Sequence, residues 1–190
     1  MNISANGMNV AFGKTPVMTC KVKKQQDNKP VDATLYRLES GSLVDLRDIE
    51  MSKTAKVLSQ HYSESTYRNK HNDFYILQND KTDEVICAAE TSHHFRTTND
   101  RFEGTSTVID EFRANDKYAN AAEPVIAHIV NKAGQQFDKS VVSALNQEEM
   151  PTLKHAKFSK TKNGDYLLPE KRFDNFANRA EKKFSIEYLV

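Results

Sequence analysis

The stretch that decides the fold runs from Thr105 to Gly134, TSTVIDEFRANDKYANAAEPVIAHIVNKAG. Its first eight residues are typical of a strand. The apolar residues that follow recur at helical spacing and predict an amphipathic helix: Ala122, Val125, Ile126, Ile129 and Val130. Pro124 suits the first turn of this helix, and Gly134 suits its end. A strand that runs into a helix N-terminus is a common place to bind phosphate, yet the turn between the two contains no glycine.

The segments on either side predict an α/β fold. DFYILQN (73–79) and EVICAAETS (84–92) are apolar runs joined by a short polar turn, which is typical of a β-hairpin. We expect 74–78, 84–91 and 105–112 to be consecutive antiparallel strands, with 141–145 parallel to the third. A further strand is expected at 33–39, helices at 40–62, 148–156 and 170–190, and a second hairpin turning at Asn163-Gly164. This order predicts a mixed, mostly antiparallel central sheet flanked by helices.

The bulk composition is that of a globular protein, with 190 residues of which 38% are hydrophobic and 28% charged. The formal net charge of +1 gives no electrostatic footprint, so we expect neither nucleic acid nor membrane as a partner. No run approaches the roughly 20 apolar residues of a membrane span, and no signal region is visible, which predicts a cytoplasmic protein. Cys87 lies in the apolar run VICAA and is predicted to be a buried small hydrophobe.

The order of elements resembles the GCN5-related N-acetyltransferase (GNAT) family. In that family the central strand leads into a loop of pattern Gln/Arg-x-x-Gly-x-Gly/Ala, which opens the next helix and binds the pyrophosphate of acetyl-CoA through backbone N–H groups. The corresponding loop here is KYANAA, from Lys117 to Ala122. Lys117 keeps a positive charge at the first position. Asn120 replaces the first glycine, and asparagine is the residue other than glycine that best takes a positive φ.

A second part of the resemblance lies after the predicted strand at 141–145. Family members often carry an Asn at the end of that strand and, twelve residues later, the Phe of a Gly-Phe pair. Here Asn146 and Phe158 stand twelve residues apart, and Lys157 takes the place of the glycine. A Tyr five residues before the Phe often protonates the departing thiolate in the family. That position is Leu153, which has no proton to donate.

The resemblance covers about residues 33–170 and implies a GNAT-like domain there. It leaves 1–32 as an N-terminal arm or edge strand and 171–190 as a C-terminal helix packed on the domain. Acetyl-CoA is the implied co-substrate. The implied cofactor-binding residues are Phe112, Lys117, Ala119, Asn120, Ala121, Ala122 and Asn146.

Similarity to this family also implies direct acyl transfer, in which an amine attacks the thioester carbonyl. The candidate bases are Glu90, at the end of the hairpin strand, and Glu111, on the central strand, since a carboxylate there could take the ammonium proton. Each of them could instead be a strand-end residue that faces solvent. Tyr118 could donate a proton to the thiolate only if its loop turned it inward.

Two functions are therefore open. In the first, the protein is a divergent N-acetyltransferase acting on an amine of a small molecule or a protein. In the second, it is a non-catalytic GNAT-like module that binds a partner through its acceptor groove or an edge strand. The missing tyrosine and glycines favour the second function, whereas Lys117 and Asn146 favour the first.

A metal site is not predicted. His93 and His94 are adjacent on a strand and so point to opposite faces, where they cannot bind one ion together. The sequence contains neither Cys-x-x-Cys nor His-Glu-x-x-His. His128 is predicted to be an ordinary residue on the face of the helix.

Overall fold

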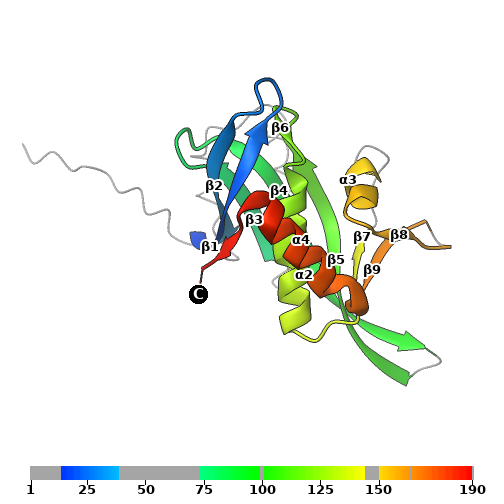
Figure 1. Cartoon of the computed structure of the whole chain (residues 1–190). Helices are drawn as coiled ribbons and strands as arrows, with labels where there is room; N and C mark the ends of the chain where they lie inside the picture. Colours follow the sequence, from blue (N-terminus) through cyan, green and yellow to red (C-terminus); the bar gives the residue numbers. More distant parts are fainter. Residues whose placement is uncertain (1–13, 39–72, 99–100, 144–149, 163, 190) are drawn as a thin grey trace, which may run out of the picture.

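A computed structural model describes residues 14–38, 73–98, 101–143, 150–162 and 164–189 (Figure 1). The strands are β1 (Lys14–Lys24), β2 (Pro30–Leu38), β3 (Asp73–Asn79), β4 (Val85–Thr98), β5 (Arg101–Ala114), β6 (Tyr118–Ala119), β7 (Ser140–Ser143), β8 (Ser159–Lys160), β9 (Tyr166–Pro169) and β10 (Glu187–Tyr188). The helices are α2 (Ala122–Gln135), α3 (Met150–His155), the 3-10 turn η2 (Glu170–Arg172) and α4 (Phe173–Phe184). The helix expected at 40–62 lies outside the described residues.

The strands form one sheet in the order β10-β1-β2-β3-β4-β5-β7-β9-β8, with β6 beside β1. The expected strand arrangement is confirmed: β3, β4 and β5 are consecutive and antiparallel. β7 runs parallel to β5, from Ser106 opposite Ser140 to Ile109 opposite Ser143. The fold is thus the predicted α/β architecture with a mixed, mostly antiparallel sheet.

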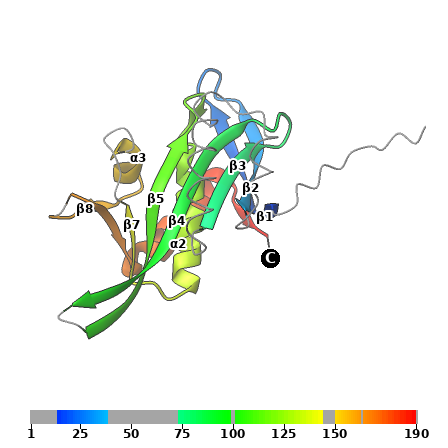
Figure 2. The ribbon, with the colours of Figure 1, turned by 180° about the vertical axis from the view of Figure 1, so that it is seen from behind.

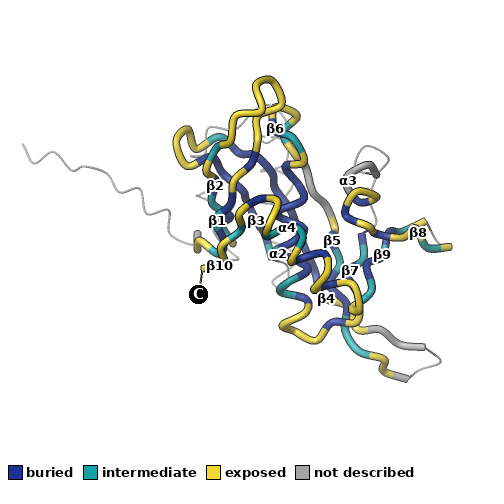
Figure 3. Tube along the Cα trace, viewed as in Figure 1, coloured by how far each residue is buried: buried dark blue, intermediate teal, exposed yellow. Residues whose placement is uncertain are grey.

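The main core lies between the sheet and α2. Figure 1 shows α2 and α4 together on one face of the sheet, and from behind the strands stand in front of both helices (Figure 2). All five residues of the predicted apolar stripe of α2 are buried. Burying a side chain such as Val125 or Ile126 contributes about 1.5–3 kcal/mol, so this helix is a major source of stability. Figure 3 shows the buried residues concentrated in the central strands and α2.

The two ends of the described chain meet at one side of the sheet. The helix expected over 170–190 ends earlier, at Phe184, because Ser185 takes a left-handed conformation with φ of 50°. The chain then turns back as β10, which pairs with β1 through Met18 opposite Tyr188. β1 itself is a long strand between β10 and β2. Residues from both sequence ends therefore share one sheet with the domain expected at 33–170.

β4 and β5 form a hairpin that extends past the rest of the sheet. The pairing of β3 with β4 begins at Asp73 opposite Thr91, and that of β5 with β7 begins at Ser106. Among the described strands, the remaining ends of β4 and β5 pair with each other alone, and they project from the body (Figures 1 and 2). Phe95 and Phe102 lie on this projecting part and are 79% and 66% exposed.

Both cysteines are free and buried, which confirms the prediction for Cys87. Burial raises the pKa of the Cys20 thiol to about 12. None of the helices in the described ranges is long and apolar enough to cross a membrane.

Candidate active site

The loop between β5 and α2 has the backbone shape that a glycine loop would have. Asn120 is left-handed, with φ of 55°, as expected for the residue that replaces the first glycine. Its carbonyl accepts the N–H of Glu123 at 3.1 Å, which starts the first turn of α2. Ala119, one residue earlier, pairs with Lys23 of β1. The loop is therefore fixed on one side by β1 and on the other by the helix.

The N-terminus of α2 has no side-chain cap and is closely packed. Ala121 precedes the helix without a side-chain cap. Among the described hydrogen bonds, the N–H groups of Ala121 and Ala122 reach no acceptor. Both residues are nevertheless buried, at 2% and 1% exposure, whereas Asn120 is exposed. Because Asn120 is the exposed residue of the three, an anion that approaches the loop from solvent contacts Asn120 first.

Lys117 brings less charge to this loop than its sequence position suggests. Its ammonium lies 2.6 Å from Glu84 Oε1, at the turn between β3 and β4. Burial raises the pKa of Glu84, but hydrogen bonds from Lys117 and Tyr118 outweigh burial and hold it below its usual value. The cation thus already has a carboxylate partner.

Tyr118 turns inward, but toward the same carboxylate. Its hydroxyl donates to Glu84 Oε2 at 2.8 Å and accepts from the Asn79 amide at 3.2 Å. Because both neighbours lie at the β3–β4 turn, Tyr118 is occupied by a structural contact.

The second part of the resemblance lies at the end of α3, where the chain turns before Phe158. Lys157, in the place of the family's glycine, is left-handed with φ of 66°. Two hydrogen bonds close the end of α3, from Lys157 N–H to Lys154 O and from Phe158 N–H to Leu153 O, each at 3.0 Å. The side chains of Phe158 and Leu153 are buried, at 5% and 0% exposure. Leu153 is thus a core residue, and Asn146 lies outside the described residues.

The two predicted bases are directly opposite each other in the sheet, Glu90 on β4 and Glu111 on β5. Glu90 is 3% exposed, so the alternative that it faces solvent is wrong. For Glu111 and Phe112 the structure describes the backbone, which places Phe112 opposite Ala89. The sequence analysis named the two glutamates as alternative bases on neighbouring strands, and the structure places their backbones opposite each other.

A third carboxylate, Asp110, was missed. Glu90 pairs with Glu111 but Thr91 pairs with Ile109, so Asp110 is the extra residue of a β-bulge. Burial raises the pKa of Asp110, a hydrogen bond with Ser92 lowers it, and the charge of Glu90 raises it, with a net increase. The sequence hints at Asp110 only through its position next to Glu111. A strand predicted from alternating residues has no bulge, so the sequence did not indicate that Asp110 would be the extra residue.

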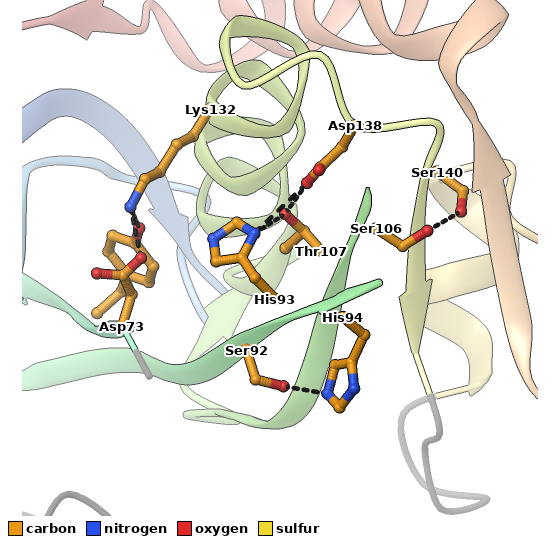
Figure 4. Close-up of polar contacts among 10 residues, drawn as sticks. Asp73, Ser92, His93, His94, Ser106, Thr107, Lys132, Asp138 and Ser140 are labelled. Atoms are coloured by element: carbon orange, nitrogen blue, oxygen red, sulfur yellow. Dashed lines mark hydrogen bonds and ion pairs between the residues drawn. The ribbon is translucent and has the colours of Figure 1, made fainter. Parts of the chain in front are cut away.

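The two adjacent histidines point to opposite faces, as predicted (Figure 4). His93 Nδ1 lies 3.6 Å from Asp138 Oδ2, which also accepts the Thr107 hydroxyl at 2.5 Å. His94 Nε2 lies 3.0 Å from Ser92 Oγ on the other face. Within the described residues, no group of three or more His, Cys, Asp or Glu could hold a metal ion.

Comparison with known proteins agrees with this architecture. No protein-family model and no curated protein matches the chain. Among solved structures, one titled AtaT complexed with acetyl-methionyl-tRNAfMet has a TM-score of 0.58 and 15% identity, over 76% of this chain and 98% of that chain. AtaTR bound with AcCoA gives 0.59 and 14%, over 75% and 96%. A KacTA–DNA complex gives 0.53 and 10%, over 70% and 88%. The chain has a GNAT-like fold.

These structures correct one expectation. The near-zero net charge was taken to exclude nucleic acid as a partner. Proteins with the same fold are nevertheless titled as complexes with tRNA and with DNA. Net charge sums over the whole surface and cannot report a local contact area, so the exclusion was wrong.

Proposed function

We propose that the protein is a divergent GNAT-like N-acetyltransferase that moves an acetyl group from acetyl-CoA to an amine. One observation carries the proposal. At two of the positions where the family has glycine this chain has Asn120 and Lys157, and both residues are left-handed. A left-handed residue other than glycine costs about 1–2 kcal/mol, so the rest of the fold must hold this conformation at both positions.

The cofactor is proposed to bind at the N-terminus of α2. Free N–H groups and the helix dipole favour the pyrophosphate there. The residues proposed to hold it are those of the loop and its neighbours: Phe112, Lys117, Ala119, Asn120, Ala121, Ala122 and Asn146. Because Ala121 and Ala122 are buried, the chain around them must open for the pyrophosphate to reach their N–H groups. We therefore expect a lower affinity than a glycine loop would give.

Bound acetyl-CoA would supply an activated acetyl thioester. The amine nitrogen would form a bond to the carbonyl carbon, the carbon–sulfur bond would break, and the thiolate would leave. The amine must lose a proton during this transfer, and a carboxylate near the bulge could take it. Glu90 and Glu111 remain the proposed bases, and Asp110 joins them because its raised pKa suits proton transfer.

The usual acid for the thiolate is absent, since that position is Leu153, which has no proton to donate and is fully buried in the core. Positioning of two reactants can lower a barrier by about 7–11 kcal/mol without any acid, so transfer does not require that residue. The rate would then depend mainly on how the amine is held.

The acceptor is proposed to be an amine on a small molecule or a protein. An amine carried by a nucleic acid belongs with these candidates, because one structure of the same fold is titled as a complex with acetyl-methionyl-tRNAfMet.

A second function, a non-catalytic binding module, is favoured by one specific feature. The ion pair between Lys117 and Glu84 occupies the cation that would otherwise meet the phosphates. In this case acetyl-CoA would neither bind nor react, and the fold would serve only to present a surface.

The experiment that separates the two functions follows release of free thiol from acetyl-CoA. The acceptors would be polyamines, amino acids, aminoglycosides, peptides and aminoacyl-tRNA. With an acceptor that reacts, Glu90→Gln, Glu111→Gln and Asp110→Asn are compared, and loss of the true base should lower kcat by roughly 10² or more. Glu103→Gln, at an exposed site on the same strand, is the matched control. Absence of turnover with every acceptor, together with no acetyl-CoA binding, would favour the binding module.

A further inference from the structure

A pocket of about 210 Å³ lies at the end of α2 away from the Asn120 loop. Its walls come from the last two turns of α2 and from β1, β2, β3 and β10. Among its lining residues are Arg37, Tyr75, His128, Lys132 and Tyr188. None of these residues has a part in the proposed acetyl transfer, so the pocket needs an explanation of its own.

Two buried polar atoms of residues that line this pocket, His128 Nδ1 and Tyr188 Oη, have no hydrogen-bond partner among the described residues. They belong to neighbouring rings whose centroids are 6.2 Å apart. On its other side His128 meets Tyr75 edge to face, with centroids 5.1 Å apart. An unsatisfied buried polar group costs about 1–3 kcal/mol, so a molecule that bonds to both atoms would recover this free energy.

Charged groups meet at two sides of the pocket: Arg37 and Lys132 around Asp73, and Glu181 near Tyr188. Asp73 is contacted by two cations, Arg37 Nε at 2.9 Å and Lys132 Nζ at 2.5 Å, the second of which Figure 4 shows. Lys132 also donates to the Tyr75 hydroxyl at 3.1 Å. In the described contacts Arg37 uses Nε alone, and its side chain is half exposed. Its terminal nitrogens form the planar fork that matches a carboxylate.

His128 itself adds no charge to this balance. Burial first, and then the nearby Lys132, lower the pKa of His128 to about 4. The imidazole is neutral near pH 7, and Nδ1 can accept or donate a hydrogen bond according to the tautomer.

We propose that this pocket binds a small phenolic carboxylic acid. The carboxylate would pair with the guanidinium of Arg37, and the ring would lie among Val17, Leu189 and the aromatic side chains. The phenolic hydroxyl, both donor and acceptor, would satisfy His128 Nδ1 and Tyr188 Oη. The size agrees, because a cavity of about 150 Å³ holds benzene and this pocket has room for one ring with its substituents.

The test is calorimetric titration of the full chain with three matched compounds. 4-Hydroxybenzoate carries both groups, benzoate lacks the hydroxyl, and 4-hydroxybenzyl alcohol lacks the charge. We expect 4-hydroxybenzoate to bind about tenfold more tightly than either of the others, since a hydrogen bond to a charged or buried group is worth about that factor.

Variants assign each preference to a residue. Arg37→Gln should remove the preference for the carboxylate, and Tyr188→Phe should remove the preference for the hydroxyl. Arg37→Lys keeps the charge beside Asp73 but loses the fork. It should fold and bind about tenfold more weakly, which covers the case in which Arg37→Gln fails to fold. Lys21→Gln, at an exposed site on β1, should change none of the affinities.

Two results would overturn the proposal. One is the absence of saturable binding by all three compounds at millimolar concentration, as expected if an ordered water bridges the two polar atoms. The other is binding whose preferences survive Arg37→Lys and Tyr188→Phe. Acetyl-CoA binding should be the same in all of these variants, so this result stands apart from the test of the proposed function.

Discussion

At the scale of single residues, Asn120 and Lys157 are the two left-handed residues that stand where the GNAT family has glycine. From the sequence, Asn120 was expected to take the positive φ of the glycine that it replaces, and its φ of 55° agrees with that expectation. Lys157 gave no such signal, because lysine has no preference for positive φ. Its conformation follows from the end of α3, where the chain turns so that Phe158 enters the core. Tertiary packing of Phe158 thus outweighs the local preference of Lys157.

The first prediction follows from this strain. Lys157→Gly should raise the free energy of unfolding by about 0.5–1 kcal/mol, because relief of the left-handed strain exceeds the extra backbone entropy of glycine in the unfolded chain. Thermal melting should show a rise in Tm of about 1–4 °C. Lys154→Gly is the matched control, since it is exposed within α3 and glycine there should cost about 1 kcal/mol. Equal effects of the two changes would contradict the left-handed assignment.

The second prediction concerns pH and His128. Its folded pKa of about 4 lies below the ordinary 6.5, so between these values the unfolded chain binds a proton that the folded chain does not. Stability is therefore fully present above pH 6.5 and falls as the pH approaches 4. At pH 5 the loss should be about 2 kcal/mol. His128→Phe should remove that part of the loss, as measured by urea unfolding at pH 7 and pH 5. Parallel behaviour of the two proteins would show that His128 does not titrate as a buried group.

At the scale of elements, the sequence predicted the hairpin, the crossover helix and the parallel strand after it. These elements have strong periodicity and local turn signals. The bulge at Asp110 and the pairing of β10 with β1 could not be predicted. The first depends on register between strands, and the second joins residues separated by most of the chain. The helix end at Phe184 was missed for a local reason: the left-handed residue after the helix is Ser185, whereas glycine is the usual terminator.

The third prediction concerns the projecting hairpin. In the part of the chain that the structure describes, Phe95–Thr98 and Arg101–Gly104 pair across two strands alone, whereas Cys87–Ala89 lie in the middle of the sheet. Hydrogen exchange should therefore be several orders of magnitude faster at the tip than in the middle of the same strands. Mass spectrometry or NMR of the protein alone would measure the gradient. Uniform protection along both strands would mean that another molecule or another copy covers the projecting part.

At the scale of the whole molecule, the order of elements was enough to predict the fold class. Few sheet topologies are compatible with hairpins followed by a strand–helix–strand crossover, and the observed sheet has one of these topologies. Net charge, in contrast, misled the analysis about nucleic acid, because it averages over the surface. The pocket beside His128 was not predicted from the sequence either, since the residues that line it come from five elements spread from Val17 to Leu189.

The central claim is that acetyl-CoA binds at the loop before α2, and calorimetric titration of acetyl-CoA tests it most directly. The wild-type chain should bind, and Asn120→Glu should bind at least tenfold more weakly, about 1.4 kcal/mol, because the new carboxylate repels the pyrophosphate. Asn175→Glu is the matched control. Asn175 is an exposed asparagine near the start of α4, where Phe173 meets Gly134 at the other end of α2, so acetyl-CoA affinity should be unchanged in that variant. No binding by the wild-type chain, or equal affinities of the wild type and Asn120→Glu, would contradict the account.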